Sequence, residues 1–284
     1  MYTKKEYKEK QLTVIELRNE NKTSWLKVVP ERGGIITSLG IQGEELLFLN
    51  EETLHNETKN IRGGIPILFP ISGQLTNGQY DWNGKTYSMK NHGFARDLPW
   101  EVIECTAAEE GIIQLRLTSN EETLAVYPFE FELIYTYILR ENELVIEQEY
   151  KNNSEDEMPI YPGFHPYFKT ANKQLKITTD ADVYLDYNDM ETKKLEDVMT
   201  IDQVESYVLK SQTNAFRFQL EEIGKQITMK YANEFPYIVL WSEEGQEFVC
   251  VEPWMAKTNE MNRKQELTLI KPGKILQTNV SISI

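Results

Sequence analysis

The sequence predicts an all-β protein built as a large antiparallel sandwich or barrel, and three observations support this prediction. Tyr, Phe and Trp occur 15, 11 and 5 times among 284 residues, and aromatic side chains are enriched in strands. Short runs of β-branched and aromatic residues recur between turn signals along the chain, as in antiparallel sheets. No stretch of twelve residues keeps a helical period.

The expected strands follow one another from residue 12 to the last residue. Asn83-Gly84 supplies the two positive-φ residues that a two-residue hairpin turn requires, so 80–88 is a predicted hairpin. Two more hairpins are expected at 100–118 and 131–150, and 274–284 alternates apolar and polar residues as a half-buried strand does. The other expected strands are 12–17, 35–39, 46–49, 175–179, 183–186, 216–220, 227–231, 237–241 and 248–251, with short helical turns at 53–60 and 192–198.

One domain covering residues 1–284 is the simplest organisation. The chain has no linker rich in Pro, Gly or Ser and no internal repeat. Sandwiches of roughly 200–250 residues commonly form one unit. We therefore expect a single β-sandwich domain with one large core.

Charge and cysteine content limit the classes of binding partner and the cellular compartment that we expect. The formal net charge is −15, from 45 acids and 30 bases, so nucleic acid and anionic membrane are not expected partners. Solubility alone is a sufficient explanation of this acidity. Cys105 and Cys250 form no Cys-x-x-Cys pattern, which suits a reducing compartment. We see no signal peptide and no run of about 18 apolar residues, so we expect a cytoplasmic protein.

Function is expected where the strand pattern breaks without a packing reason. The first such segment is Arg62-Gly63-Gly64, where glycine lets a backbone or ligand approach closely. A strand-entry turn with Arg62 in a surface ion pair explains it as well. In the second segment, His92 precedes a glycine and stands near Arg96. A structural hydrogen bond is the other explanation for His92.

The third and fourth segments each place a titratable residue directly before proline. His165 stands between two prolines in an aromatic cluster, and Glu252 ends an apolar run before Pro253-Trp254. Proline pushes the residue before it into an extended conformation, so both side chains are expected on stiff backbone. A satisfied histidine in an aromatic core and an exposed glutamate at a strand end remain the alternatives. His55 lies in a polar stretch and is expected to be exposed and without function.

Other chemistries find little support. The chain has no Gly-x-Ser-x-Gly, no P-loop and no Gly-x-Gly-x-x-Gly. Three histidines without paired ligand spacing do not predict a metal site. No metal or redox cofactor is therefore expected.

Taken together, the four segments resemble the aldose 1-epimerase (mutarotase) superfamily, and most closely its lacX-like and hexose-6-phosphate mutarotase-like branch. The motifs occur in the family order over residues 32–254. They are Arg62-Gly-Gly-Ile-Pro with Phe-Pro70, His92-Gly-Phe-Ala-Arg96, Phe164-His165-Pro-Tyr-Phe168 and Val251-Glu252-Pro-Trp254.

The resemblance implies a large galactose mutarotase-like β-sandwich whose concave face holds a pyranose. It implies Glu252 as general base, His165 as general acid and His92 as a second imidazole at the ring oxygen. It also implies that Arg62 contacts the substrate, with Arg96 a weaker candidate. A hydroxyl-orienting aspartate is present in the galactose-specific branch; no motif places it here, and Asp186 is a guess. Trp254 offers a flat apolar face to the sugar.

The expected reaction is the interconversion of hexose anomers by acid–base ring opening and closure. Packing is expected to raise the pKa of Glu252, and a nearby carboxylate is expected to favour protonated His165. Three alternatives stay open: a non-catalytic sugar-binding protein, a glycoside hydrolase, and a hexose-6-phosphate mutarotase in which Arg62 and Arg96 grip the phosphate. The sequence does not decide between free and phosphorylated sugar, nor does it give the oligomeric state.

Overall fold

The structure, a computed structural model, describes all 284 residues, and antiparallel strands make up most of its regular secondary structure. Its largest sheet has nine strands in the order β19-β16-β21-β22-β26-β12-β11-β10-β9. In sequence order these are β9 (Glu101–Ala107), β10 (Gly111–Thr118), β11 (Phe131–Leu139), β12 (Glu143–Asn152), β16 (Gln174–Thr178), β19 (Val198–Thr200), β21 (Ala215–Leu220), β22 (Lys225–Tyr231) and β26 (Ile275–Ser283).

A second sheet carries the segments singled out for function. Its order is β18-β17-β20-β23-β24-β14-β6, with β15 also paired to β24. The strands are β6 (Ile67–Leu68), β14 (Gly163–Phe164), β15 (Tyr167–Lys169), β17 (Val183–Asp186), β18 (Glu191–Lys194), β20 (Tyr207–Lys210), β23 (Tyr237–Trp241) and β24 (Phe248–Trp254).

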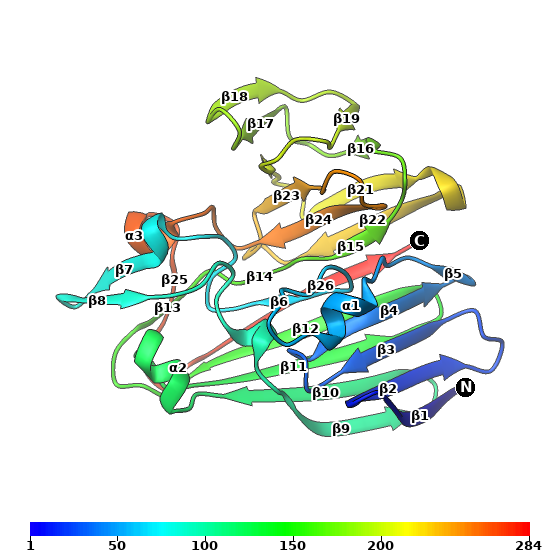
Figure 1. Cartoon of the computed structure of the whole chain (residues 1–284), viewed down its shortest axis with the longest axis horizontal. Coiled ribbons are helices and arrows are strands. Elements are labelled where there is room, and N and C mark those ends of the chain that lie inside the picture. Colours follow the sequence, from blue (N-terminus) through cyan, green and yellow to red (C-terminus); the bar gives the residue numbers. More distant parts are fainter.

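The N-terminal residues form a third, five-stranded sheet, and β1 and β2 of this sheet lie next to β9 and β10 (Figure 1). The β17–β18 hairpin lies at the far end of the molecule from the N-terminus (Figure 1). The five strands are β1 (Tyr2–Glu9), β2 (Leu12–Asn19), β3 (Trp25–Val29), β4 (Ile35–Ile41) and β5 (Glu44–Glu45). Two further sheets have two strands each. One pairs β7 (Gln79–Trp82) with β8 (Lys85–Ser88), and the other pairs β13 (Met158–Ile160) with β25 (Thr268–Ile270).

Helices are few and short. The longest α-helix, α2, has six residues, whereas about 20 are needed to cross a bilayer, and no helix is long and apolar enough to span a membrane. The α-helices are α1 (Glu51–His55), α2 (Glu121–Val126) and α3 (Glu260–Arg263); the 3-10 turns are η1 (Thr76–Gly78), η2 (Ala95–Asp97) and η3 (Glu221–Ile223).

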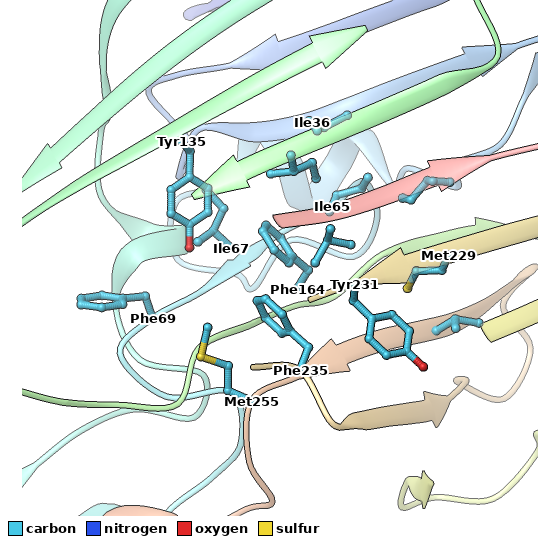
Figure 2. Close-up of a cluster of buried hydrophobic side chains, with 14 of the residues drawn as sticks. Ile36, Ile65, Ile67, Phe69, Tyr135, Phe164, Met229, Tyr231, Phe235 and Met255 are labelled. Atoms are coloured by element: carbon cyan, nitrogen blue, oxygen red, sulfur yellow. The ribbon is translucent and has the colours of Figure 1, made fainter. Parts of the chain in front are cut away.

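The core lies between the sheets. Figure 2 shows side chains from different sheets pointing into one interior, among them Ile36 of β4, Tyr135 of β11, Phe164 of β14 and Met229 of β22. All four are buried. Because the strands of a sandwich alternate inward and outward side chains, this interior fixes the register of each strand.

The predicted fold class is confirmed, and the hairpin around Asn83-Gly84 forms with positive φ at both residues. Two local expectations were wrong. Residues 191–194 are strand β18 instead of a helical turn, because their backbone pairs with β17 and Leu185 faces Thr192. The charged N-terminal segment forms β1, which the sequence did not predict because it has no apolar alternation; pairing with β2 determines it.

Removal of an aromatic ring from this core tests how much the packing contributes. Phe131 is 1% exposed, and its ring centroid lies 5.1 Å from that of Phe69. We expect Phe131→Ala to lower the free energy of unfolding by about 3–5 kcal/mol, because the lost ring leaves a cavity. Chemical denaturation followed by circular dichroism measures the change. Val102→Ala on the same sheet, at a side chain that is 37% exposed, is the control and should shift stability by about 0.5 kcal/mol or less. Equal effects would contradict the proposed packing.

Candidate active site

Strand β24 brings a carboxylate into a hollow of the second sheet. All seven of its residues are buried. Glu252 faces Val239 of β23, while Gly163 of β14 faces Trp254. Because alternate residues of a strand share a face, Cys250, Glu252 and Trp254 point to the same side. The side chain of Glu252 is therefore held by strands on both flanks, and the residue is 1% exposed.

His165 stands between β14 and β15, both of which pair with β24. Its main-chain N–H donates to the carbonyl of Pro66 at 3.1 Å, and its ring stacks on Tyr167 with centroids 4.6 Å apart and planes 11° apart. The imidazole Nε2 lies 3.4 Å from Oε1 of Glu252. The extended backbone expected before Pro166 and Pro253 thus brings an imidazole and a carboxylate into contact.

His92 reaches the same hollow from a loop with unusual backbone. Its φ is +65°, a left-handed conformation that costs on the order of 1–3 kcal/mol for a non-glycine residue. Next to it, Gly93 has φ +72°, and a Cβ there would meet the Phe69 carbonyl oxygen at 2.1 Å. Only glycine fits at position 93, which explains the His-Gly pair. The His92 ring centroid lies 5.3 Å from that of His165.

The contacts of His92 decide which of its nitrogens faces the hollow. Nδ1 lies 2.6 Å from the carbonyl oxygen of Ser72. A carbonyl oxygen only accepts hydrogen bonds, so Nδ1 carries the proton. Nε2 then presents a lone pair. Burial, followed by the charge of Arg96, lowers the pKa of His92 to about 3, so the ring stays neutral near pH 7.

The pKa of Glu252 is shifted in the direction that the sequence predicts, whereas the pKa of His165 is shifted in the opposite direction. Burial raises the pKa of Glu252 well above its usual range, although the Trp254 N–H and Arg96 oppose the shift. Burial also lowers the pKa of His165 well below its usual range, and His92, Arg96 and Arg62 add to it. The expectation that the carboxylate favours protonated His165 was wrong, because desolvation and the nearby cations outweigh it.

The hollow has a volume of about 250 Å³, which is below the roughly 300–1,000 Å³ of sites for drug-sized ligands. Such a space suits a single sugar ring. A larger hollow of about 440 Å³ lies on the other side of the His92 loop and has no histidine in its wall. The smaller one is lined by Arg62, Gly73, Gln74, Asn91, His92, His165, Tyr187, Val204, Glu205, Ser206, Trp241, Glu252, Trp254 and Thr258.

Arg62 and Trp254 both line the hollow. The Arg62 Nε lies 2.8 Å from Oε2 of Glu243, and its guanidinium lies over the ring of Trp241 at 5.3 Å. The indole N–H of Trp254 donates to Oε2 of Glu252 at 3.0 Å. Trp254 therefore orients the carboxylate as well as presenting an aromatic face.

Arg96, Asp186 and His55 do not line it. Arg96 donates to the carbonyl of Asn91 at 3.1 Å and so supports the His92 loop from behind. Oδ2 of Asp186 lies 2.6 Å from Nζ of Lys193, within its own hairpin. His55 ends α1 and is half-buried instead of exposed.

Sequence reasoning missed several polar residues of the hollow. Gln74, Asn91, Tyr187, Glu205 and Thr258 all line it. They come from loops far apart in sequence and belong to no motif. The position of Asn91, directly before His92, was the one available signal.

Comparisons with known proteins identify the family of the chain. The family model described as "Aldose 1-epimerase" matches residues 13–283. "Protein LacX, chromosomal" of Lactococcus lactis subsp. lactis is 25% identical, over 95% of this chain and 99% of its own. A relative of Escherichia coli (strain K12), named "Putative glucose-6-phosphate 1-epimerase", is 24% identical over 83% of this chain and 79% of its own.

Solved structures share the fold. The Slr1438 protein of Synechocystis sp. PCC 6803 superposes with a TM-score of 0.91 at 32% identity, over 95% of this chain and 94% of that one. A galactose mutarotase related enzyme of Lactobacillus acidophilus superposes with a TM-score of 0.75 at 23% identity, over 99% and 97%, which shows the fold alone. With the family model matching nearly its whole length, this chain belongs to the aldose 1-epimerase family of isomerases, whose small-molecule substrates are sugars.

Proposed function

We propose that this protein interconverts the α and β anomers of a free hexose, with Glu252 and His165 as its acid–base pair. The contact between His165 Nε2 and Glu252 Oε1, 3.4 Å long and almost wholly buried, carries the proposal. Sugar binding alone needs no such pair. A glycoside hydrolase needs two carboxylates that flank the bond to be cleaved. The second carboxylate that lines this hollow belongs to Glu205, an exposed loop residue, so it does not form such a pair with the buried Glu252.

The reaction needs two proton transfers and no other reagent. Glu252 as carboxylate takes the proton from the O1 hydroxyl, and His165 as imidazolium gives its proton to the ring oxygen. The C1–O5 bond breaks, O1 becomes the aldehyde oxygen, and rotation about C1–C2 presents the other aldehyde face. Ring closure reverses both transfers, so the pair returns to its starting protonation. Each positioned group contributes typically about 10²–10⁴ in rate.

The empty and the reactive forms of the pair hold the same number of protons. With the pKa of Glu252 raised and that of His165 lowered by burial, the empty pair favours a neutral carboxyl and a neutral imidazole. Moving that one proton from Glu252 to His165 gives the reactive ion pair. A bound sugar brings hydroxyl groups into the hollow, and hydrogen bonds to the charged forms favour this transfer.

His92 acts as a hydrogen-bond acceptor in this proposal. Its Nδ1 proton is directed to the Ser72 carbonyl, so Nε2 has a lone pair and no proton to donate. The ring oxygen of a sugar can only accept a hydrogen bond, and the Nε2 atom of neutral His92 has no proton to donate to it. His92 Nε2 therefore accepts from a sugar hydroxyl and holds the pyranose against the acid–base pair.

The charges around the hollow favour an unphosphorylated sugar. Arg62 is the one cationic residue among those that line it, and it is already paired with Glu243. Arg96, the second arginine considered for gripping a phosphate, does not line the hollow. Glu205 adds a negative charge to the wall. A phosphate dianion would find only Arg62, whose charge is already balanced by Glu243, in a chain of net charge −15. We therefore expect weak binding of a phosphorylated sugar.

Replacement of the base tests the chemistry. We expect Glu252→Gln to lower kcat for anomer exchange by about 10²–10⁴ while the fold is kept, since the amide cannot accept the O1 proton. Polarimetry of freshly dissolved α-D-glucose and α-D-galactose measures the rate. Glu104→Gln, on exposed strand β9, is the control and should behave as the parent. Undiminished catalysis in Glu252→Gln would rule out this base.

The two imidazoles should differ in the size of their effect. His165→Asn removes a proton donor and should be nearly inactive, whereas His92→Asn removes a hydrogen-bond acceptor and should keep partial activity with a raised KM. Polarimetry at several sugar concentrations separates kcat from KM, and circular dichroism checks the fold of both variants. If His92→Asn is the more crippled in kcat, the two roles are reversed.

The choice of sugar is tested by anomer-exchange NMR with glucose and galactose and with their 6-phosphates. We expect kcat/KM for at least one free hexose to exceed that for its 6-phosphate by about tenfold or more, the equivalent of about 1.4 kcal/mol in transition-state binding. The uncatalysed exchange of each sugar is subtracted. A preference for the phosphates would overturn the free-hexose assignment and leave the acid–base pair in place.

A further inference from the structure

A third potential ligand lies beside the acid–base pair and has no part in anomer exchange. Cys250 is two residues before Glu252 on β24, on the same side of the strand, and lies opposite Tyr167 of β15. It is fully buried and forms no disulfide. The ring opening described above needs one base and one acid, so the thiol remains unused.

The three side chains offer the mixed donors that thiophilic metals bind. The ligand atoms of His165, Cys250 and Glu252 all lie within 4.8 Å of one another. No metal site was predicted from the sequence, because His165 is far along the chain from Cys250 and Glu252 and no paired ligand spacing is present. The pairing of β15 with β24 brings them together.

We infer that His165, Cys250 and Glu252 form an inhibitory binding site for a thiophilic divalent cation such as Zn²⁺ or Cd²⁺. Around a tetrahedral zinc, ligand distances of about 2.0–2.3 Å put the ligand atoms roughly 3.2–3.8 Å from one another. A contraction of about 1 Å at the widest separation therefore closes the site. His165 and Glu252 both line the hollow, whereas the fully buried Cys250 does not. An ion that enters through the hollow therefore meets His165 and Glu252 first and reaches the Cys250 thiol beside them.

Metal binding and catalysis exclude each other here. The ion takes the carboxylate of Glu252 and the Nε2 lone pair of His165, and these are the groups that move protons. The thiol of Cys250 and the neutral carboxyl of Glu252 each give up a proton to solvent as their bonds to the metal form, so two protons are released and no oxidant or reductant is involved. Mg²⁺ prefers oxygen ligands in octahedral geometry and should not compete for this site.

Cadmium titration tests the site without relying on the proposed function. Cd²⁺ bound to a thiolate gives a sulfur-to-metal charge-transfer band in the ultraviolet, at shorter wavelength than the aromatic absorption. We expect this band in the difference spectrum of the parent protein with and without Cd²⁺, at one ion per chain. Cys250→Ser, and as a second variant Cys250→Ala, should lose it. Cys105→Ser is the matched control, because Cys105 lies on β9 outside the hollow, and it should keep the band. A parent without the band, or a band lost only in Cys105→Ser, would overturn the inference.

Inhibition links the site to anomer exchange and rests on the proposed function. We expect Zn²⁺ but not Mg²⁺ to inhibit the parent. Half-inhibition of Cys250→Ser should require about tenfold more Zn²⁺ or higher, each variant being compared with its own metal-free rate. Equal zinc sensitivity of the parent and Cys250→Ser would overturn the inference. A protein that shows the cadmium band but no anomer exchange would refute the proposed function and leave the metal site standing.

Discussion

The backbone pairing around β24 is the constraint on which the site depends. This strand is hydrogen-bonded to β23 on one side and to β14 and β15 on the other. Glu252 and the neighbouring His165 therefore have little freedom to separate, even though burial opposes a charge on either of them. A carboxylate and an imidazole in water would pair only weakly and briefly, whereas here the sheet fixes their distance and the surrounding rings exclude water.

The loops add what the sheet cannot supply. The left-handed backbone at His92 and the close approach of Gly93 to Phe69 place a neutral imidazole next to His165 and Glu252. Arg96 holds the same loop through the Asn91 carbonyl. This explains why an arginine that does not line the hollow belongs to the motif: its position supports His92 and adds positive charge near Glu252.

Burial gives this site its chemical character and also exposes it to competing ligands. Desolvation favours the neutral form of both groups, so the single proton of the pair rests on Glu252 when the hollow is empty. The thiol of Cys250, which the proposed reaction does not use, is buried next to the pair. The strands that hold His165 and Glu252 close together thus also place a thiol within reach of both, and this is the basis of the metal site that we propose.

The sequence by itself determined the fold class, the family and most of the candidate side chains of the hollow, because each of these depends on patterns within short stretches of the chain. Period-two alternation and Asn-Gly turns specify strands and hairpins locally, and His165-Pro166 and Glu252-Pro253 each carry their own backbone restriction. The single domain and the roles of individual residues remain predictions. Only the tertiary structure decided that β1 and β18 are strands, that Asp186 pairs within its hairpin, and that Arg96 stands behind the hollow. It also decided the pKa of His165, since desolvation and the charges of distant residues depend on how non-adjacent strands pack.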